Sequence, residues 1–357
     1  MAFDLFPLVK PLLHALDAER AHTLTISALK AGLASLIATG KDPASLHTEV
    51  FGLSFSNPIG MAAGFDKNAD VITPTHNLGF GFAEAGTVTP EPQVGNEKPR
   101  LFRLIEDQAV INRFGFNNNG LSYFAQRLQK LKTGGKPFGA NVGANKTSED
   151  KTADYVTGVE SLYGLSDYFT VNISSPNTPG LRSLQSKEAL SDLVDRVLKA
   201  RQRKIDEGMP RIPILVKIAP DLMRQDITDI AEIARTTDID GLIVSNTTIT
   251  RPDSLKSTNR NQMGGLSGSP LMALATSALS KIYVATEGQV PLIGVGGIAT
   301  GADAYAKIRA GASLVQLYSA LVYQGPALVR HIKADLAACL EKDGFKNVSD
   351  AVGADHR

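Results

Sequence analysis

Residues 168–180 read YFTVNISSPNTPG, in which an apolar run from Tyr168 to Val171 leads directly into a loop of small polar residues. A short run without alternating polar residues predicts a strand that is buried on both faces. Pro176 and Pro179 stiffen the loop and exclude a helix directly after the strand. The fold therefore depends on how often the chain repeats this unit.

Eight such runs occur after about Phe51, and helical patterns separate them. They span residues 58–62, 81–85, 138–142, 168–172, 214–218, 241–245, 292–295 and 313–317. Buried strands that alternate with helices indicate a parallel sheet, and eight in series favour a closed barrel. We therefore predict an α/β fold, a (β/α)8 TIM barrel; an open doubly wound sheet is the alternative.

The segments outside this pattern are short. Residues 1–45 carry two one-sided apolar patterns, Leu5–Leu16 and Ile26–Ile37, and predict an amphipathic helical hairpin. Such a hairpin either packs on the barrel as an ordinary cap or lies on a membrane surface and opens toward a lipid-soluble ligand. No window reaches the ~18 apolar residues of a membrane-spanning helix.

We expect three regions: the hairpin over residues 1–45, the barrel over residues 46–340 and a C-terminal tail over residues 341–357. Two strand-like pieces at residues 100–104 and 109–113 predict a β-hairpin inserted at the barrel mouth. The segment 257–269, rich in Gly, Ser and Asn, is expected to be a long loop after the sixth strand.

The composition limits the classes of function. The chain has 357 residues, of which 43% are hydrophobic and 20% charged, as in a globular protein. A net charge of +1 offers no basic excess for nucleic acid. The single cysteine, Cys339, excludes an internal disulfide and fits a small buried hydrophobe in a late helix. There is no zinc motif, so we expect no metal site, and no histidine ends a strand, so the general base is another residue type.

Polar residues at strand ends are the candidate site, because a barrel carries its function at the carboxyl ends of its strands. Lys217 lies inside an apolar strand, where a cation is costly unless an anion meets it. It either extends to solvent, meets an anionic cofactor or acts as an imine-forming nucleophile. Four amides at or after strand ends, Asn141, Asn172, Asn177 and Asn246, suit a planar heterocycle, although each alone is more often a turn residue.

The loops after the last two strands, the first of them rich in glycine, predict a phosphate cradle. They are Gly294–Ala299 and Gln316–Ala320, and Gly264–Gly268 adds a further loop of close approach. The first loop also fits a dinucleotide fingerprint, but it lies too late in the chain to open a nucleotide-binding fold. One phosphate and a planar ring indicate FMN or another monophosphate cofactor.

In combination, these motifs resemble the dihydroorotate dehydrogenases, specifically the class 2, membrane-associated and quinone-dependent branch. The matching stretches are Ala62–Lys67 (AAGFDK), Ile111–Asn118 (INRFGFNN), Asn172–Gly180 (NISSPNTPG), Leu215–Pro220 (LVKIAP), Ser245–Thr248 (SNTT), Gly264–Gly268 (GGLSG), Gly294–Ile298 (GVGGI) and Leu314–Leu321 (LVQLYSAL). They cover almost the whole chain after Phe51, and Asp17–His22 looks like the helical extension of this class.

The resemblance implies an FMN site, with one residue, Ser245, where Thr is also expected. Its members would be Ala63, Gly64, Lys67, Thr87, Asn141, Asn172, Lys217, Ser245, Gly268, Gly297, Tyr318 and Ser319. The resemblance also implies a dihydroorotate site made of Lys67, Asn112, Arg113, Phe114, Gly115, Phe116, Asn172, Asn177, Asn246 and Thr247.

The family's catalytic base corresponds to Ser175, where class 1 enzymes carry Cys instead. On resemblance alone, His22, Arg103 and Tyr318 are candidates for a quinone tunnel. The implied reaction oxidises (S)-dihydroorotate to orotate with hydride transfer to FMN and reoxidation by ubiquinone or a related quinone, in pyrimidine synthesis. We expect peripheral contact with membrane lipid on the cytoplasmic face, and no nucleic-acid or obligate protein partner.

Two other flavin barrels and one binding protein are the rival interpretations. A 2-hydroxyacid oxidase would need a histidine at a strand end, and a tRNA dihydrouridine synthase would need a basic surface; the chain has neither feature. A membrane adaptor without enzymatic activity would use the N-terminal hairpin alone and would be colourless.

Overall fold

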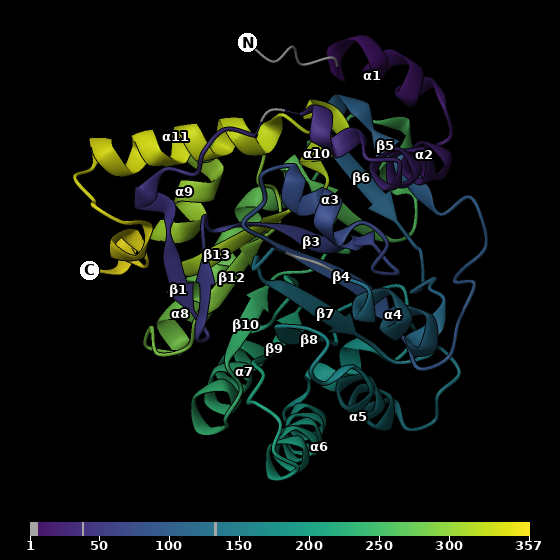
Figure 1. Cartoon of the computed structure of the whole chain (residues 1–357), viewed down its shortest axis with the longest axis vertical. Coiled ribbons are helices and arrows are strands. Elements are labelled where there is room, and N and C mark those ends of the chain that lie inside the picture. Colours follow the sequence, from purple (N-terminus) through teal and green to yellow (C-terminus); the bar gives the residue numbers. More distant parts are fainter. Residues whose placement is uncertain (1–5, 38, 132–133) are drawn as a thin grey trace.

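Eight parallel strands close into a barrel in the computed structural model, which describes residues 6–37, 39–131 and 134–357 (Figure 1). In chain order they are β3 (Ile59–Asp66), β4 (Phe82–Val88), β7 (Phe138–Val142), β8 (Tyr168–Asn172), β9 (Ile214–Ile218), β10 (Gly241–Val244), β12 (Leu292–Val295) and β13 (Ala312–Leu317). Pairing of β13 with β3 and of β9 with β10 leaves no open edge in this ring. The predicted TIM barrel is confirmed, and the open sheet is wrong.

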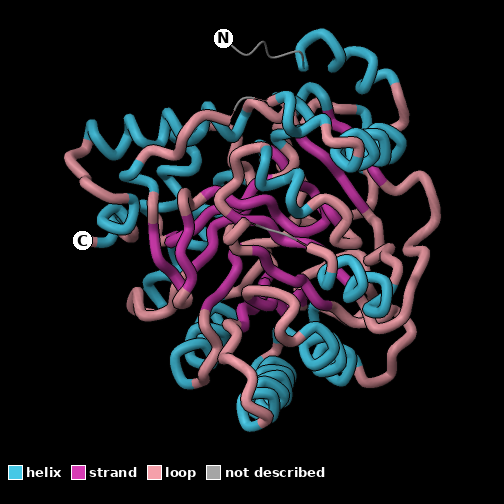
Figure 2. The backbone as a smooth tube through the Cα atoms, in the orientation of Figure 1, coloured by secondary structure: helices cyan, strands magenta, loops and turns pink. Residues whose placement is uncertain are grey.

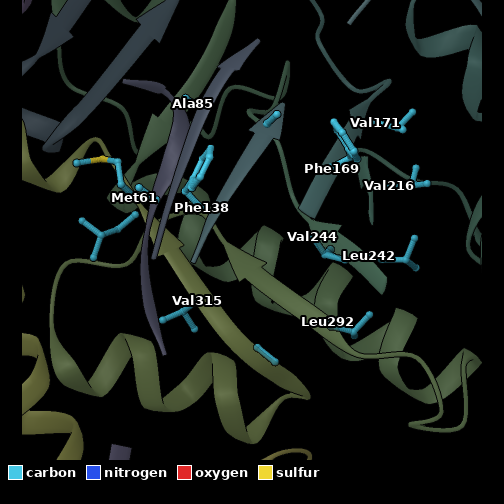
Figure 3. Close-up of a cluster of buried hydrophobic side chains, with 14 of the residues drawn as sticks. Met61, Ala85, Phe138, Phe169, Val171, Val216, Leu242, Val244, Leu292 and Val315 are labelled. Carbon is cyan, nitrogen blue, oxygen red and sulfur yellow. The ribbon is translucent and has the colours of Figure 1, made fainter. Parts of the chain in front are cut away.

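A helix follows every barrel strand, and together these helices form the outer layer (Figure 2). They are α3 (Ile72–Asn77), α4 (Gly120–Gln129), α5 (Lys151–Leu162), α6 (Lys187–Asp206), α7 (Arg224–Thr236), α8 (Met272–Ala285), α9 (Gly301–Arg309) and α11 (Leu328–Lys342). The outward side chains of the strands pack under these helices in one continuous apolar cluster. Figure 3 shows part of that cluster, including Met61, Phe138, Phe169 and Val315.

Side chains inside the barrel alternate with those of the outer cluster and form layers along the barrel axis. The lowest layer is apolar and contains Phe82, Tyr168, Leu215, Ile243, Ile293 and Leu314. Two glycines make room for its rings, because a Cβ on Gly60 would lie 2.3 Å from Phe82 and one on Gly139 would lie 2.2 Å from Tyr168.

A short β-hairpin, β1 (Thr48–Val50) and β2 (Leu53–Phe55), supplies residues to this lowest layer. Phe55 is fully buried, and its ring meets that of Phe82 edge-on at 5.3 Å. The sequence analysis did not predict this hairpin, because its strands have only three residues each. The hairpin therefore belongs to the barrel interior at the end opposite to the carboxyl ends of the strands.

The predicted insertion at the barrel mouth is present but larger than expected. β5 (Leu101–Leu104) and β6 (Ala109–Asn112) form the predicted hairpin, and β11 (Gly265–Gly268) adds a third antiparallel strand beside β6. The loop expected over residues 257–269 therefore ends in a strand. Its glycines concealed the strand in the sequence, because glycine contributes no side chain to the pattern.

The N-terminal helices cover the same end of the barrel as β5 and β6 (Figure 1). α1 (Phe6–Ala15) lies beside the short helix α10 (Ala320–Gln324), and α2 (Ala18–Lys30) lies beside β5. Leu5 of the predicted pattern lies outside the described residues, and a 3-10 turn at Leu33–Leu36 replaces the end of the second predicted helix.

Ion pairs tie α2 to the barrel. Glu19 accepts two hydrogen bonds from the Arg100 guanidinium, and Lys30 contacts Asp70 at 2.9 Å. Of the described helices, none is long and apolar enough to cross a membrane.

The C-terminal tail also packs on the barrel. Val348 and Ala351 are fully buried, and Arg309 of α9 pairs with Asp355 at 2.7 Å.

Replacing Phe55 with alanine tests the role of the lower hairpin. F55A should lower the free energy of unfolding by about 3–5 kcal/mol, because it leaves a cavity under Phe82 in a layer that has no room to collapse. Denaturant titration followed by circular dichroism measures the loss. V94A, at a residue that is 87% exposed, is the control and should change stability by less than about 0.5 kcal/mol. A loss of similar size in both variants would contradict the role of the hairpin.

Candidate active site

A cavity of about 770 Å³ lies at the carboxyl ends of the barrel strands and continues along α1 and α2. Almost every residue proposed from the sequence lies on its wall. Those residues are His22, Ala63, Gly64, Lys67, Thr87, Arg103, Asn112, Phe114, Gly115, Phe116, Asn172, Ser175, Asn177, Lys217, Ser245, Asn246, Thr247, Gly268, Gly297, Tyr318 and Ser319. Asn141 and Arg113 are the two proposed residues that do not line it.

Glu84 of β4 is the residue that organises the barrel interior beneath this cavity. Its buried carboxylate accepts hydrogen bonds from Asn141 (2.7 Å), Thr170 (3.0 Å), Gln316 (3.0 Å) and the Tyr168 hydroxyl (3.3 Å). The donors come from β7, β8 and β13, so one carboxylate fixes side chains on three other strands. Burial, reinforced by Glu84, raises the pKa of Tyr168 well above its usual value, which keeps that hydroxyl a donor.

Sequence analysis did not identify Glu84, although the signal was available. An acidic residue inside the buried run of residues 81–85 is as costly as a lysine inside residues 214–218. The two residues are electrostatic partners in the fold. Burial lowers the pKa of Lys217, and the charge of Glu84 opposes that shift, which favours a charged ammonium under the cavity.

Asn141 is fully buried and acts through its neighbours. Its amide donates to Glu84, and its Oδ1 accepts from the Thr87 hydroxyl (2.6 Å) and from Asn172 Nδ2 (3.2 Å). Asn172 Nδ2 also donates to Thr87 Oγ1 at 2.9 Å. The amides of β7 and β8 are therefore held in one orientation from below, with Asn172 on the cavity wall.

The loop after β8 carries Ser175, which is 5% exposed and faces the cavity. Ser175 Oγ accepts a hydrogen bond from the backbone N–H of Asn177 at 3.2 Å. The preceding residue is fixed as well, because Ser174 Oγ donates to Asn172 Oδ1 and accepts from Asn246 Nδ2, each at 3.0 Å. The start of this loop is thus tied to the ends of β8 and β10.

The tip of the same loop is tied to the last residue of β6 and to the segment before β5. Asn177 Nδ2 donates to the backbone carbonyl of Asn112 at 3.1 Å, and Asn96 Nδ2 donates to the carbonyl of Asn177 at 3.2 Å. These bonds close the loop over the cavity. Arg113 turns away from it: its guanidinium donates to Gln262 Oε1 at 3.1 Å and lies over the Phe102 ring at 4.7 Å.

Lys67 places a cation in the cavity wall. Its ammonium donates to the Gly64 carbonyl at 2.9 Å and lies 4.4 Å from the centre of the Phe114 ring. Arg100 lies 5.6 Å from the same ring, so Phe114 is flanked by two cations. Burial lowers the pKa of Lys67 to about 8. An anion at this position would restore the charged form.

His22 of α2 reaches the barrel from the N-terminal helices. Its Nε2 lies 3.4 Å from the Lys67 ammonium, and its Nδ1 lies 3.2 Å from the Tyr318 hydroxyl. Burial, with the charge of Lys67 as a second cause, lowers the pKa of His22 well below its usual value, so the imidazole is neutral at pH 7. Farther along the cavity, Arg103 donates to the carbonyls of Leu13 and Leu16 in and after α1.

The glycine loops form a cradle on the opposite wall. Gly296 and Gly297 adopt positive φ angles of 107° and 82°, and a Cβ on Gly297 would lie 2.4 Å from the Cα of Met272. The Ser319 hydroxyl donates to Ser267 Oγ at 2.8 Å, which joins the loop after β13 to β11. This wall exposes backbone and small hydroxyl groups, as an anion site requires.

Replacing Glu84 with glutamine tests the interior network. E84Q should lower the free energy of unfolding by about 1–3 kcal/mol. The substitution replaces one accepting oxygen with an NH2 group, whose two N–H donors then face the donors that the carboxylate had satisfied. E91Q, at an exposed carboxylate on the loop after β4, is the matched control and should leave stability unchanged. Denaturant unfolding of both variants makes the comparison, and equal stabilities would contradict the network.

Comparison with known proteins places this geometry in a family. A family model described as dihydroorotate dehydrogenase matches residues 45–340. A protein of Azorhizobium caulinodans named dihydroorotate dehydrogenase (quinone) is 56% identical over 99% of this chain and all of the relative. Its mitochondrial counterpart in Arabidopsis thaliana is 50% identical over 99% of this chain and 82% of the relative.

Solved structures agree with the sequence comparison. The crystal structure of the Eimeria tenella enzyme in complex with ferulenol matches with a TM-score of 0.90 and 41% identity, over 95% of this chain and 96% of that one. Its ligand-free form matches with a TM-score of 0.89 and 42% identity, over 96% of this chain and all of that one. The chain belongs to the dihydroorotate dehydrogenase family, in the class whose curated members are named dihydroorotate dehydrogenase (quinone).

Proposed function

We propose that this chain is an FMN-dependent enzyme that oxidises (S)-dihydroorotate to orotate, a step of pyrimidine synthesis, and delivers the electrons to a membrane quinone. The observation that carries the proposal is the meeting of three features at one cavity: a serine on a closed loop, a set of oriented amides and a buried lysine. Membership of the dihydroorotate dehydrogenase family supports the same assignment.

The residues present fit FMN. Gly268, Gly297 and Ser319 would hold the phosphate, since this wall offers backbone groups with no side chain in the way. Lys217, with Thr87, Asn172 and Ser245 nearby on the wall, would hold the polar edge of the ring, and Ala63, Gly64 and Tyr318 would complete the site. Asn141 would act from below by orienting Asn172. When bound, FMN supplies a two-electron acceptor that takes a hydride from dihydroorotate and returns the electrons to a quinone.

Dihydroorotate would lie under the loop after β8. Its carboxylate fits the cationic wall at Lys67, and its ring N–H and C=O groups fit the side-chain amides of Asn112, Asn172, Asn177 and Asn246, which can both donate and accept. Phe114, Gly115, Phe116 and Thr247 also line this part of the cavity. Arg113 would contribute by bracing the Asn112–Phe116 segment from outside, since its side chain lies on Phe102.

Ser175 would act as the base. Ser175 would take the proton from C5 while its own hydroxyl proton passes to a neighbouring group or a water chain. Bound FMN would supply the acceptor for the hydride from C6, and the C5–C6 bond would become the double bond of orotate. A serine hydroxyl is a weak base at pH 7, so its placement is decisive. The Asn177 N–H donates to Ser175 Oγ and holds the oxygen in the loop, while Pro176 and Pro179 restrict the backbone on either side.

The quinone would approach along α1 and α2, past Arg103 to His22 and Tyr318. Neutral His22, whose ring nitrogens lie near Lys67 and the Tyr318 hydroxyl, is the polar group at the inner end of this stretch, whose wall also includes Val9, Leu13 and Leu24. The helices would lie on the membrane surface, because Leu8 and Leu12 are 78% and 68% exposed on α1. The exposed leucines support a peripheral contact with the membrane, for which we propose the cytoplasmic face.

Anaerobic mixing with dihydroorotate tests the function and the base together. The purified protein should be yellow, should be bleached by dihydroorotate and should recover its colour with a ubiquinone analogue. S175A should keep the flavin but slow the bleaching by roughly 10²- to 10⁴-fold, since the general base is lost. S183A removes an exposed hydroxyl in the 3-10 turn that follows this loop, where it donates to the Gly180 carbonyl, and should match the parent. Bleaching of S175A at the parent rate would refute the base assignment.

The pKa of Lys67 predicts how the affinity for orotate depends on pH. The ammonium is charged below pH 8 and loses its proton above it, so anion binding should weaken by up to tenfold per pH unit above about 8. K67M should bind orotate weakly throughout and show no such slope. Titration of the flavin absorbance with orotate between pH 6.5 and 9 measures the affinity of the parent and of K67M at each pH. K98M, at an exposed lysine beside Glu19, should keep the parent slope, and a flat profile in the parent would be inconsistent with the role of Lys67.

A further inference from the structure

Arg182 connects three loops at the barrel mouth with one guanidinium. It lies in the 3-10 turn Arg182–Gln185, directly after the loop that carries Ser175. Its Nε donates to the Ser174 carbonyl at 3.1 Å, and its Nη2 donates to the Thr247 carbonyl at 2.9 Å. Its Nη1 pairs with the Asp221 carboxylate at 2.9 Å. The contacts therefore reach the loops after β8, β9 and β10.

Asp221 holds Arg182 in place and has its own ties to the loop after β10. Its carboxylate accepts hydrogen bonds from the Thr248 hydroxyl, from the Thr250 hydroxyl at 3.1 Å and from the Ile249 N–H at 3.2 Å. The side chains of Arg182 and Asp221 are 21% and 14% exposed, so water screens this pair only partly. The planar guanidinium holds its three partners in a fixed geometry, which the single ammonium of a lysine could not reproduce.

The two carbonyls that accept from Arg182 belong to residues next to the proposed base and next to a proposed substrate-binding amide. Ser174 precedes Ser175, and Thr247 follows Asn246. On this side the Asn246–Ser174 hydrogen bond is the other polar anchor of the loop start, while Pro179 and Gly180 are exposed. The contacts of Asn177 with Asn112 and Asn96 tie the tip of the loop to the other side of the cavity. Arg182 therefore acts beside the Asn246–Ser174 hydrogen bond in setting the distance between Ser175 and the loop after β10.

We infer that Arg182, held by Asp221, is a positioning residue for the reaction: it sets the place of the Ser175 hydroxyl relative to Asn246 and Thr247. The inference rests on the proposed function, in which Ser175 is the base. A base displaced by ~1 Å can lose about a hundredfold in rate. The guanidinium contacts a carbonyl in the loop after β8 and one in the loop after β10, so it acts on the proton-abstraction step and leaves the quinone path along α1 and α2 untouched.

Measuring the two half-reactions separately in the FMN-loaded enzyme tests this role. R182A should slow bleaching by saturating dihydroorotate by roughly tenfold to a hundredfold. Recovery of colour with a ubiquinone analogue should stay within about twofold of the parent. R182K should rescue the first rate only in part, and D221N should lower it in the same direction. K187M breaks an exposed ion pair with Glu232 five residues farther along the chain, and should leave both rates unchanged.

A double variant separates positioning from general loss of structure. If Arg182 acts through Ser175, S175A/R182A should bleach at the rate of S175A alone, because the hydroxyl to be positioned is gone. Hydrogen exchange of the peptide over residues 173–181 should be faster in R182A than in the parent and in K187M, with the flavin content unchanged.

Three outcomes would overturn the inference: equal slowing of both half-reactions in R182A, multiplicative effects in the double variant, or unchanged exchange in the loop peptide. Failure of the proposed function gives a different result. In that case dihydroorotate would not bleach the parent enzyme at all, or S175A would bleach at the parent rate, whatever Arg182 does.

Discussion

The carboxylate of Glu84 inside the barrel is the interaction on which the site depends. A buried carboxylate is tolerated when its oxygens are hydrogen-bonded, and Glu84 accepts from donors on three strands. Its charge also opposes the effect of burial on the pKa of Lys217. The apolar layer below it, with Phe82 and Phe55, excludes water from that end of the barrel. The same carboxylate orients Asn141 and, through it, Asn172. The cavity floor is therefore rigid before any ligand enters.

Above this floor, the reacting groups lie on loops, which need anchors of their own. The loop after β8 is held at its start by Ser174, at its tip by Asn177 and at its end by Arg182. These polar contacts hold the residues that face the cavity, while Ile173 and Leu181 at the two ends of the loop are buried in the apolar cluster. On the other side, His22 links the N-terminal helices to Lys67 and Tyr318, so the two proposed substrate paths meet at one imidazole.

Much of this architecture could be predicted from the sequence because it repeats. β7, β8, β9 and β12 have the expected bounds, since a doubly buried strand bounded by turn residues is a local signal. β1, β2 and β11 were missed because each has at most four residues, and β11 is half glycine. Glu84 was missed for another reason. A carboxylate inside a buried run is a local signal, but its four hydrogen-bond partners are far from it in the chain and cannot be read from that run.

The sequence by itself determined the eight strand-and-helix units, the family resemblance and the set of polar residues at the strand ends, because these follow from local periodicity and local motifs. Only the tertiary structure decided which of those residues face the cavity. It buried Asn141 below the wall, turned Arg113 outward onto Phe102 and joined Arg182 to Ser174, Asp221 and Thr247. The reason is physical: a barrel brings side chains from distant strands within hydrogen-bonding distance, and those distances depend on closure of the whole ring.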